Sequence, residues 1–346
     1  MIPVFDGHND FLQRVVAQGP AVWTTGDGTG HLDLPRARAG GLVGGFFAIW
    51  IPAPLNPNDA AAVALMENPP YAMPLPPRIP FAEALPHAFA QASALKALER
   101  TGTLNIVTSA RAIRETVAAG RIAAIMHMEG AEAIPDIDAL HLWHGAGLRS
   151  LGPVWSRPTV YADGVPFAFP SSPDTGAGLT DAGKTLVREC NGLRIMLDLS
   201  HLNEAGFNDV AALSDAPLVA SHSCVHAISE SSRNLTDRQL RMIADSGGLV
   251  GLNFASSFLR EDGRRLPLEG LDTMLRHLDH LLAILGEDGV ALGSDFDGAL
   301  MPRDLPDAAA LPALLAAMQH HGYGQDLIRK IACDNWIALL ERTWGE

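Results

Sequence analysis

The chain has 346 residues, of which 47% are hydrophobic and 18% are charged, a balance that excludes a disordered chain and suits a well-buried core. Its formal net charge is −14 and no cluster of lysines or arginines stands out. Because phosphate neutralisation needs a basic face, we expect no nucleic-acid partner. No apolar run is long enough to span a bilayer, so we expect no membrane anchor.

The cysteines and the N-terminal segment bear on the compartment. Cys190, Cys224 and Cys333 are widely spaced and odd in number, which predicts neither a disulfide framework nor a metal knuckle. The opening MIPVFDGHND has no basic region followed by an apolar run. We therefore expect a cytoplasmic protein.

Short apolar runs bounded by Gly, Pro, Asp or Ser recur along the chain and predict eight strands. In chain order they are 2–8, 42–50, 121–129, 148–155, 193–201, 216–223, 248–254 and 289–297.

Helical periodicity separates the predicted strands. Apolar residues recur at spacings of three and four over 84–100 and 271–285, and 235–247 reads as a capped helix that ends at a glycine. Eight strands alternating with helices in one chain predict a (β/α)₈ barrel, a single domain over 1–346. The alternative is an open sheet of seven or nine strands.

Two insertions follow predicted strand ends. Residues 51–80 contain nine prolines, and residues 157–178 read RPTVYADGVPFAFPSSPDTGAG. In a barrel, both would lie at the C-terminal face. Their aromatic residues favour walls over a site rather than solvent-exposed decoration.

Polar side chains that bind metals gather where the predicted strands end. A parallel barrel brings these ends to one rim, where active sites are assembled, and imidazoles with carboxylates suit Zn²⁺ or a similar ion. The residues concerned are His8, Asp10, His127, Glu129, Asp198, His201, His222 and Asp295.

The opening FDGHND has two such groups on one predicted strand. Alternate residues point to the same side, so His8 and Asp10 aim together at the rim while Asn9 turns away. Burying such a pair without a cation is costly. A single histidine at a strand end is more often structural, but four separate strand ends supplying such groups favour a metal site.

The remaining histidines lack this placement. His127 shares a face with Glu129, and its role stays open between a group behind the ligands, a core residue and a ligand. We leave it outside the predicted ligand set.

Several motifs, taken in order, resemble the membrane (renal-type) dipeptidases of the binuclear-metal amidohydrolase superfamily. They are FDGHND, MEGAE (128–132), DLSH (198–201), SHS (221–223), SSRN (231–234), GSDFDG (293–298) and the closing KIACDNW. The resemblance runs from residue 4 to about residue 337.

The resemblance implies a zinc-dependent dipeptidase that cleaves small dipeptides, including those with a D-residue at the C-terminal position. It implies two Zn²⁺ per chain: His8 and Asp10 bind one, His201 and His222 bind the other, and Glu129 bridges both. A water between two such ions loses its proton near neutral pH. A homodimer is a further expectation of the family.

Two more roles follow from the resemblance. Asp295 is the acid/base carboxylate that accepts a proton and returns it to the leaving amine. Arg233 binds the terminal carboxylate of the substrate through its planar fork.

One position departs from the family pattern. The family has a histidine after its fourth strand that contacts the substrate, whereas this chain has Trp155, which donates one hydrogen bond and carries no positive charge. Either Arg157 or Tyr161 replaces the histidine, or the substrate differs. The alternatives are a related amidohydrolase acting on an N-acyl amino acid or a lactam, and a non-hydrolytic metal-binding homologue.

Overall fold

The computed structural model describes residues 2–53 and 59–345 and contains a strand that overlaps each of the eight predicted ranges. These strands are β1 (Val4–Asn9), β2 (Leu42–Trp50), β5 (Ile122–Glu129), β6 (Leu148–Gly152), β8 (Met196–Leu197), β9 (Val219–Ser223), β10 (Leu249–Asn253) and β11 (Val290–Gly293). Among the described residues, three further strands were not predicted: β3 (Tyr71–Ala72), β4 (Leu104–Ile106) and β7 (Ala168–Phe169).

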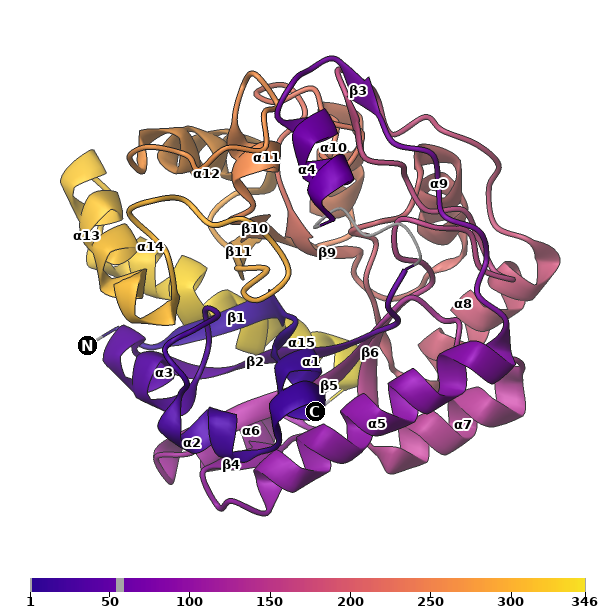
Figure 1. Ribbon diagram of the computed structural model, residues 1–346, viewed down its shortest axis with the longest axis horizontal. Coiled ribbons are helices and arrows are strands. Elements are labelled where there is room, and N and C mark those ends of the chain that lie inside the picture. Colours follow the sequence, from indigo (N-terminus) through magenta and orange to yellow (C-terminus); the bar gives the residue numbers. More distant parts are fainter. Residues whose placement is uncertain (1, 54–58, 346) are drawn as a thin grey trace.

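The strands form two parallel sheets that curl around a common interior. One sheet runs β1-β2-β5-β6-β8 with β4 added beside β5, and the other runs β9-β10-β11. All pairings within them are parallel, which confirms the predicted parallel α/β architecture. Figure 1 shows the strands at the centre of the molecule and the long helices around them.

Two buried aspartates join the sheets. Isolated parallel bridges link Asp198 to Val219 and Asn9 to Phe296. At the first seam, Asp198 accepts hydrogen bonds from the backbone N–H and the hydroxyl of Ser221. At the second seam, Asp6 accepts the same two bonds from Ser294, at 2.7 and 2.8 Å. Each carboxylate satisfies polar groups that the adjoining ladders leave unpaired.

The helices cover the outside of the sheets. They are α1 (Phe11–Gln18), α2 (Ala21–Thr25), α3 (Leu34–Gly40), α4 (Ala60–Met66), α5 (Phe81–Glu99), α6 (Ala110–Ala118), α7 (Ile137–Ala146), α8 (Asp181–Leu193), α9 (Glu204–Leu213), α10 (Asp237–Asp245), α11 (Ser256–Leu259), α12 (Asp272–Leu285), α13 (Leu311–His321), α14 (Gln325–Arg329) and α15 (Asn335–Trp344), with a 3₁₀ turn at Ala308–Ala310 and a π turn at Lys330–Asp334.

The three helices predicted from periodicity are confirmed as α5, α10 and α12. The cap predicted for 235–247 is present, and the residue that caps α10 is Thr236. Its hydroxyl accepts from the Gln239 backbone, and the Gln239 side chain accepts from the Thr236 backbone. This reciprocal pair explains why the helix begins where it does.

Three predicted strands extend too far at their C-terminal ends. β6 stops at Gly152, before Pro153, which has no N–H to give to a ladder. β8 ends at Leu197, so His201 lies in the turn that follows. β11 ends at Gly293, and the next turn contains Asp295 with a positive φ of 62°, which a strand does not allow.

The two insertions pair with each other. Tyr71 and Ala72 of β3 lie opposite Phe169 and Ala168 of β7 in a small antiparallel sheet. Part of the predicted insertion 51–80, residues 54–58, lies outside the described residues. The short sheet holds α4 and the second insertion over one end of the central strands (Figure 1).

A buried tryptophan packs in a second apolar cluster between the strands. Trp336 of α15 is fully buried, donates from Nε1 to the Leu292 carbonyl at 2.8 Å and packs on Phe46 with ring centroids 4.9 Å apart. Gly7 and Gly251 face it: an added Cβ would lie 2.5 and 3.1 Å from its Cζ2 atom. Glycines in two strands therefore make room for this indole.

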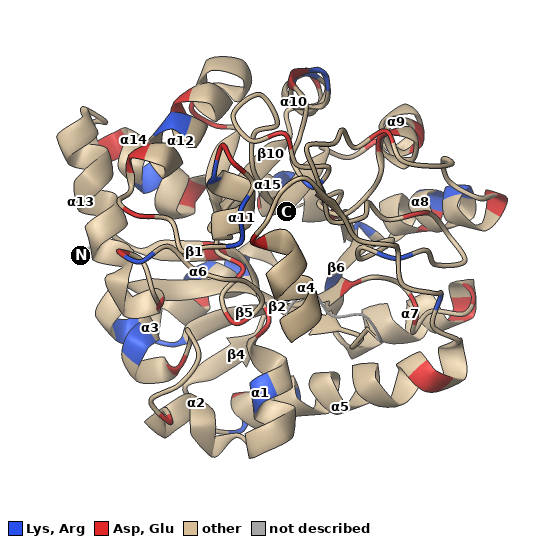
Figure 2. Ribbon diagram, turned by 45° about the horizontal axis from the view of Figure 1, so that its top comes forward, with Lys and Arg blue, Asp and Glu red and all other residues tan. Residues whose placement is uncertain are grey.

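Charged residues of both signs are dispersed over the outer elements, as Figure 2 shows. Within the described residues, no helix has the length and apolar character needed to cross a bilayer. The three cysteines are buried and do not form disulfides with one another.

Candidate active site

The carboxylate of Glu129 divides the predicted ligands into two sets. Its Oε1 atom lies 3.0 Å from His201 Nε2 and 3.4 Å from His222 Nε2. Its Oε2 atom lies 3.7 Å from His8 Nε2, and Asp10 Oδ2 lies 3.6 Å from that same nitrogen. The structure thus brings all five predicted ligands together, as two groups of possible donors that share Glu129.

The strand ends place these groups as the alternation of side chains predicts. Asn9 turns away from the site and donates from Nδ2 to the Phe46 carbonyl of β2 at 3.0 Å. Asp10 occupies the N-cap position of α1, but its side chain caps no backbone N–H and points to His8 instead. An aspartate that gives up a capping bond is available for another partner.

Unsatisfied buried atoms test whether a cation fits. His8 Nδ1, His8 Nε2 and Asp10 Oδ1 are buried and have no hydrogen-bond partner among the described residues. Orphaned polar atoms in such a position are costly. Imidazole nitrogens and carboxylate oxygens are the donors that a divalent transition metal takes, so the donor set fits one.

The electrostatics of the cluster follow from its burial. Burial, with a contribution from Arg233 and His8, lowers the pKa of His201 and His222 well below the usual value, so both imidazoles are neutral, as metal ligands must be. Burial raises the pKa of Glu129 well above its usual range. Burial opposes the charged form of His8, but the carboxylates of Glu129 and Asp10 outweigh it and raise the pKa of His8 to about 10.

His127 lies behind this cluster. Its Nδ1 atom is 2.8 Å from Ser150 Oγ, its Nε2 atom is 3.6 Å from Asp198 Oδ2, and its ring packs edge-on against His8. Burial lowers the pKa of His127 to about 3. Its contacts are with buried polar groups, and it does not line the cavity described below.

Asp295 is held beside the ligands by the turn after β11. Asn253, the last residue of β10, donates from Nδ2 to Asp295 Oδ2 at 3.0 Å. Burial, followed by the nearby charge of Asp10, raises the pKa of Asp295. A Cβ on Gly298 would lie 2.0 Å from Asp10 Oδ2 and 2.4 Å from Asp295 Oδ1, so this close approach requires glycine.

Arg233 lies next to the two histidines of the second group. It is buried and donates from Nη2 to the His222 carbonyl at 2.9 Å, from Nη1 to Ser223 Oγ at 3.0 Å and from Nε to His201 Nε2 at 3.3 Å. It is not among the residues that line the cavity, although it borders one of them, His201.

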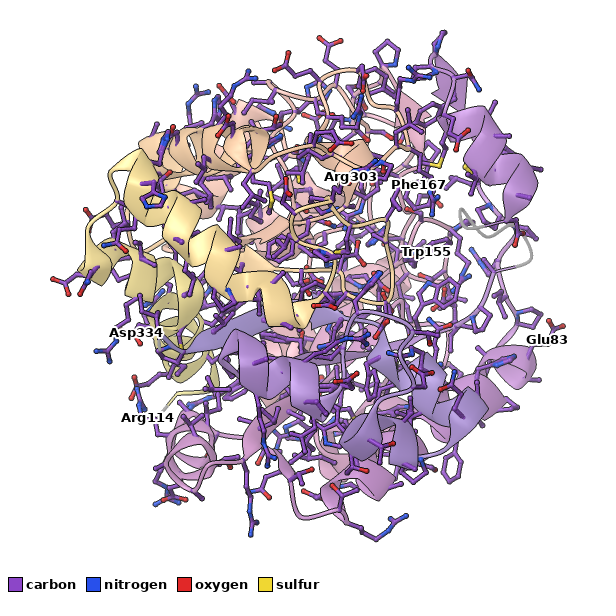
Figure 3. All side chains as sticks on the ribbon, turned by 60° about the vertical axis from the view of Figure 1, so that its left-hand side comes forward. Glu83, Arg114, Trp155, Phe167, Arg303 and Asp334 are labelled. Atoms are coloured by element: carbon purple, nitrogen blue, oxygen red, sulfur yellow. The ribbon has the colours of Figure 1, made fainter. Side chains whose placement is uncertain are left out.

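Trp155 lies against the ligands as part of an aromatic wall. Its ring centroid is 5.3 Å from Trp50, 5.7 Å from Phe167 and 5.9 Å from His201. Trp155 and Phe167 are neighbours in Figure 3, and Phe167 stacks on Phe258. The second insertion therefore supplies part of this wall, as predicted.

Neither residue suggested to replace the family histidine faces the site. Arg157 is fully buried, pairs with Glu132 and donates to the Ile51 carbonyl at 2.7 Å. The Tyr161 hydroxyl donates to the Ile134 carbonyl at 2.7 Å. The Arg157 guanidinium lies 5.2 Å from the centroid of the Trp155 ring, and its Nη1 atom has no hydrogen-bond partner among the described residues. The cation therefore lies against Trp155 and does not line the cavity.

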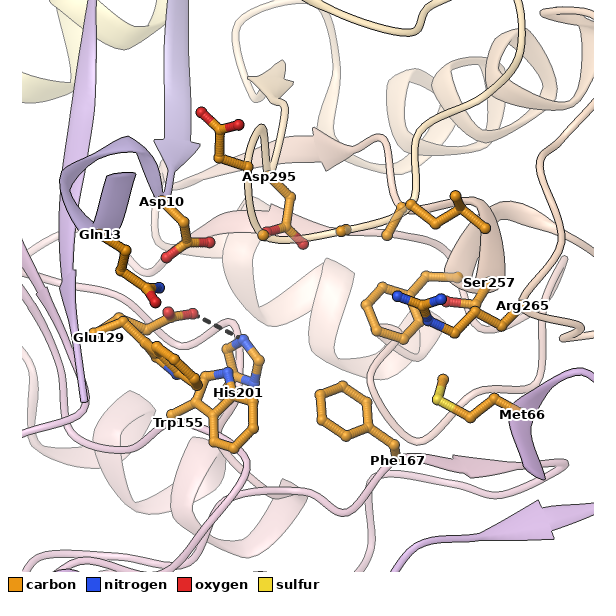
Figure 4. Close-up of a pocket in the computed structure, with 17 residues that line it drawn as sticks. Asp10, Gln13, Met66, Glu129, Trp155, Phe167, His201, Ser257, Arg265 and Asp295 are labelled. Atoms are coloured by element: carbon orange, nitrogen blue, oxygen red, sulfur yellow. Dashed lines mark ion pairs between the residues drawn. The ribbon is translucent and has the colours of Figure 1, made fainter. Parts of the chain in front are cut away.

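A cavity of about 730 Å³, including its open mouth, unites these residues. Figure 4 shows Asp10, Glu129, His201 and Asp295 at one side and Arg265, Ser257 and Met66 at the other. Sequence reasoning did not identify the following lining residues: Gln13, Trp50, Met66, Phe258 and Arg265. Trp50 is the last residue of a predicted strand, so its position at a strand end could have identified it. Arg265 follows no predicted strand or motif.

Known proteins are similar to this chain in sequence and in structure. The family model for membrane dipeptidase (peptidase family M19) matches residues 1–343. A protein of the pqqA 5′ region of Klebsiella pneumoniae is 44% identical over 246 residues, which are 71% of this chain and 91% of that protein.

Two solved structures superimpose over nearly the whole chain. One is a metallo peptidase from Rhodobacter sphaeroides liganded with a phosphinate mimic of the dipeptide L-Ala-D-Ala. It is 59% identical to this chain, with a TM-score of 0.97, and the match covers 99% of each chain. The other is dipeptidase AC, a metallo peptidase of family M19. It is 59% identical, with a TM-score of 0.96, and the match covers 100% of this chain and 99% of that one. The chain therefore belongs to the membrane dipeptidase family, peptidase family M19, and is a metallo-dipeptidase, a hydrolase of peptide bonds.

Proposed function

We propose that this enzyme holds two Zn²⁺ ions and hydrolyses small dipeptides of the L-Xaa-D-Xaa type. The proposal is carried by the placement of the two carboxylate oxygens of Glu129. Oε1 faces His201 and His222, while Oε2 faces His8. A carboxylate placed between two donor sets suits a bridging ligand. His8 with Asp10 would hold one ion and His201 with His222 the other.

When bound, two such ions supply Lewis acidity toward the scissile carbonyl and lower the pKa of water at the site. The protein contributes the proton transfer. Asp295 is the group we assign to it: Oδ2 is anchored by Asn253, which leaves Oδ1 to accept a proton from the attacking water and to pass it to the leaving amine nitrogen. Burial raises the pKa of Asp295, which favours the protonated form that delivers a proton to the leaving amine.

Arg233 is the residue we assign to the terminal carboxylate of the substrate. Its Nε now donates to His201 Nε2, and that nitrogen has one lone pair. A cation on His201 would take the lone pair and leave Arg233 Nε available for a carboxylate. The related peptidase from Rhodobacter sphaeroides, which binds a mimic of L-Ala-D-Ala, supports a substrate with a free carboxylate and a D-residue at that end.

Trp155 is assigned to the wall that lies against the bound dipeptide. Together with Trp50 and Phe167 it shields the ligand His201 from solvent. Such a water-poor wall strengthens electrostatic interactions at the reacting bond.

We also propose that the two sheets form one (β/α)₈ barrel, a single domain over 1–346 with the insertions 51–80 and 157–178. The bridges Asn9–Phe296 and Asp198–Val219 and the seams at Asp6 and Asp198 support it. A cytoplasmic location and a homodimer stay predictions, for which cell fractionation and light scattering are the tests.

A panel of dipeptides tests the proposed function. Protein with two zinc ions measured per chain should cleave L-Ala-D-Ala, and Asp295→Asn should lower kcat by several orders of magnitude with the zinc content unchanged. If zinc-loaded protein cleaves none of the dipeptides, the proposal is wrong.

The aromatic wall around Trp155 favours one alternative, an amidohydrolase acting on an N-acyl amino acid or a lactam. Activity on N-acetylated substrates equal to that on free dipeptides would support it. A non-hydrolytic homologue would instead keep its function after Asp295→Asn.

A further inference from the structure

The cavity has a cationic residue at the side away from the ligand cluster. Among the described residues that line it, Arg265 is the only lysine or arginine. Of the lining acids, Asp10, Glu129 and Asp295 belong to the ligand side, and Asp297 pairs with Arg14. In Figure 4, Arg265 lies across the cavity from Glu129 and His201, beside Ser257 and above Met66.

The segment that carries Arg265 is anchored to the first insertion. The Arg265 backbone N–H donates to the Met66 carbonyl at 3.0 Å, and the Tyr71 hydroxyl donates to the Gly263 carbonyl at 3.1 Å. Burial lowers the pKa of Arg265, with Glu67 and Tyr71 acting in the opposite direction, and a guanidinium stays charged at neutral pH. The two hydrogen bonds therefore hold the backbone that presents this charge to the cavity.

Arg233 and Arg265 stand at different distances from the ligands. The terminal carboxylate of a dipeptide is one carbon away from the scissile nitrogen, so its partner must adjoin the ligand cluster. Arg233 does, because it donates to His201 Nε2 at 3.3 Å. Arg265 lies at the other side of the cavity, where only a substrate side chain would reach it.

Phe258 connects the two arginines. The Arg233 guanidinium carbon is 5.8 Å from the centroid of the Phe258 ring, and Phe258 lines the cavity together with Arg265. A residue whose terminal carboxylate is bound at Arg233 would lie along Phe258, and its side chain would extend toward Arg265. A guanidinium at that point matches a second carboxylate better than an apolar or a cationic group.

We propose that Arg265 is a specificity-determining residue that binds an acidic side chain on the C-terminal residue of the substrate. The enzyme then prefers dipeptides that end in aspartate or glutamate over their amide counterparts. This inference rests on the proposed dipeptidase function, and it adds the chemical class of the second residue.

The test compares the zinc-loaded wild type with Arg265→Gln on two substrates of nearly equal shape, L-Ala-D-Asp and L-Ala-D-Asn. The wild type should favour the acid in kcat/KM, and the variant should reduce the acid-to-amide ratio by about 10- to 100-fold, the size of a charge-assisted hydrogen bond. The charge reversal Arg265→Glu should shift the preference toward L-Ala-D-Lys. Arg264→Gln, at the exposed neighbouring arginine, is the matched control and should keep the wild-type ratio.

Calorimetric binding of non-hydrolysable phosphinate mimics with Asp or Asn side chains repeats the comparison without turnover. Equal affinities for the two mimics, or an equal loss on both in Arg265→Gln, contradict the role of Arg265 and leave the dipeptidase function standing. Preferential binding of the acidic mimic that disappears in Arg265→Gln supports the role, even if no dipeptide is hydrolysed and the proposed function fails.

Discussion

Asn253 donates a hydrogen bond from Nδ2 to Oδ2 of Asp295 at 3.0 Å and thereby ties the last residue of β10 to the turn after β11. The other amide atom, Oδ1, accepts from the Ala255 backbone at 2.6 Å, so the orientation of the side-chain amide is determined by its partners. Asn253 is fully buried, and its hydrogen bond directs the carboxylate that we assign to proton transfer.

Asn253→Ala should lower kcat by about 10- to 100-fold, because a hydrogen bond to a charged group is worth roughly 1.5–3 kcal/mol. Zinc content should stay at the wild-type level, since Asn253 belongs to neither of the two ligand sets that share Glu129. The measurement is steady-state kinetics beside elemental analysis of the same sample. An unchanged kcat would show that the turn alone orients Asp295.

Glu129→Gln should abolish the binding of two ions. A neutral amide cannot serve as an anionic ligand to both donor sets that Glu129 now faces. Elemental analysis should find less than one tightly bound zinc per chain, and added zinc should no longer raise the melting temperature. Glu115→Gln, at an exposed carboxylate, is the control and should bind zinc as the wild type does. Two tightly bound ions in Glu129→Gln would rule out the bridging role.

His277 should make the protein less stable in mild acid. Its Nδ1 accepts from the Val225 N–H at 3.1 Å and its Nε2 donates to the Leu259 carbonyl at 3.0 Å, an arrangement that only the neutral ring permits. The pKa of His277 is lowered to about 4, mainly by burial. Between this pKa and the ordinary value of about 6.5 the unfolded chain binds more protons, so stability falls as the pH falls through this window.

If the pH falls through the whole range between these two pKa values, His277 lowers the free energy of unfolding by roughly 3 kcal/mol. Free energies of unfolding measured at pH 6.5 and 4.5 should therefore decline less for His277→Gln than for the wild type. His87→Gln, at an exposed histidine of α5, should decline as the wild type does. Identical slopes for the wild type and His277→Gln would refute the prediction.

Trp336→Ala should destabilise the fold by about 3–5 kcal/mol, the usual cost of removing a buried aromatic side chain from a core. It would leave a void against Phe46 and Gly251 and remove the donor to the Leu292 carbonyl. Denaturant unfolding at matched zinc content measures the loss. Leu142→Ala, at a side chain that is 77% exposed, should change the free energy of unfolding little. A loss below 1 kcal/mol for Trp336→Ala would show that the strands close without this indole.

The sequence by itself determined eight of the strands, the parallel architecture and which imidazoles and carboxylates come together. Continuous apolar runs identify buried strands because both faces of such strands are covered, and the period of two determines that His8 and Asp10 point the same way. His201 lies with Glu129 and His222 even though its strand ended earlier than expected, since the motif DLSH depends on order along the chain rather than on the exact strand end.

Only the tertiary structure decided how Glu129 divides its two oxygens, where Arg233 and Trp155 lie, and that Arg265 faces the cavity. These relations join residues that are far apart in the chain and lie on loops. Loop conformations depend on distant contacts such as the β3–β7 pairing and the bond from Arg265 to Met66, and no local periodicity encodes them.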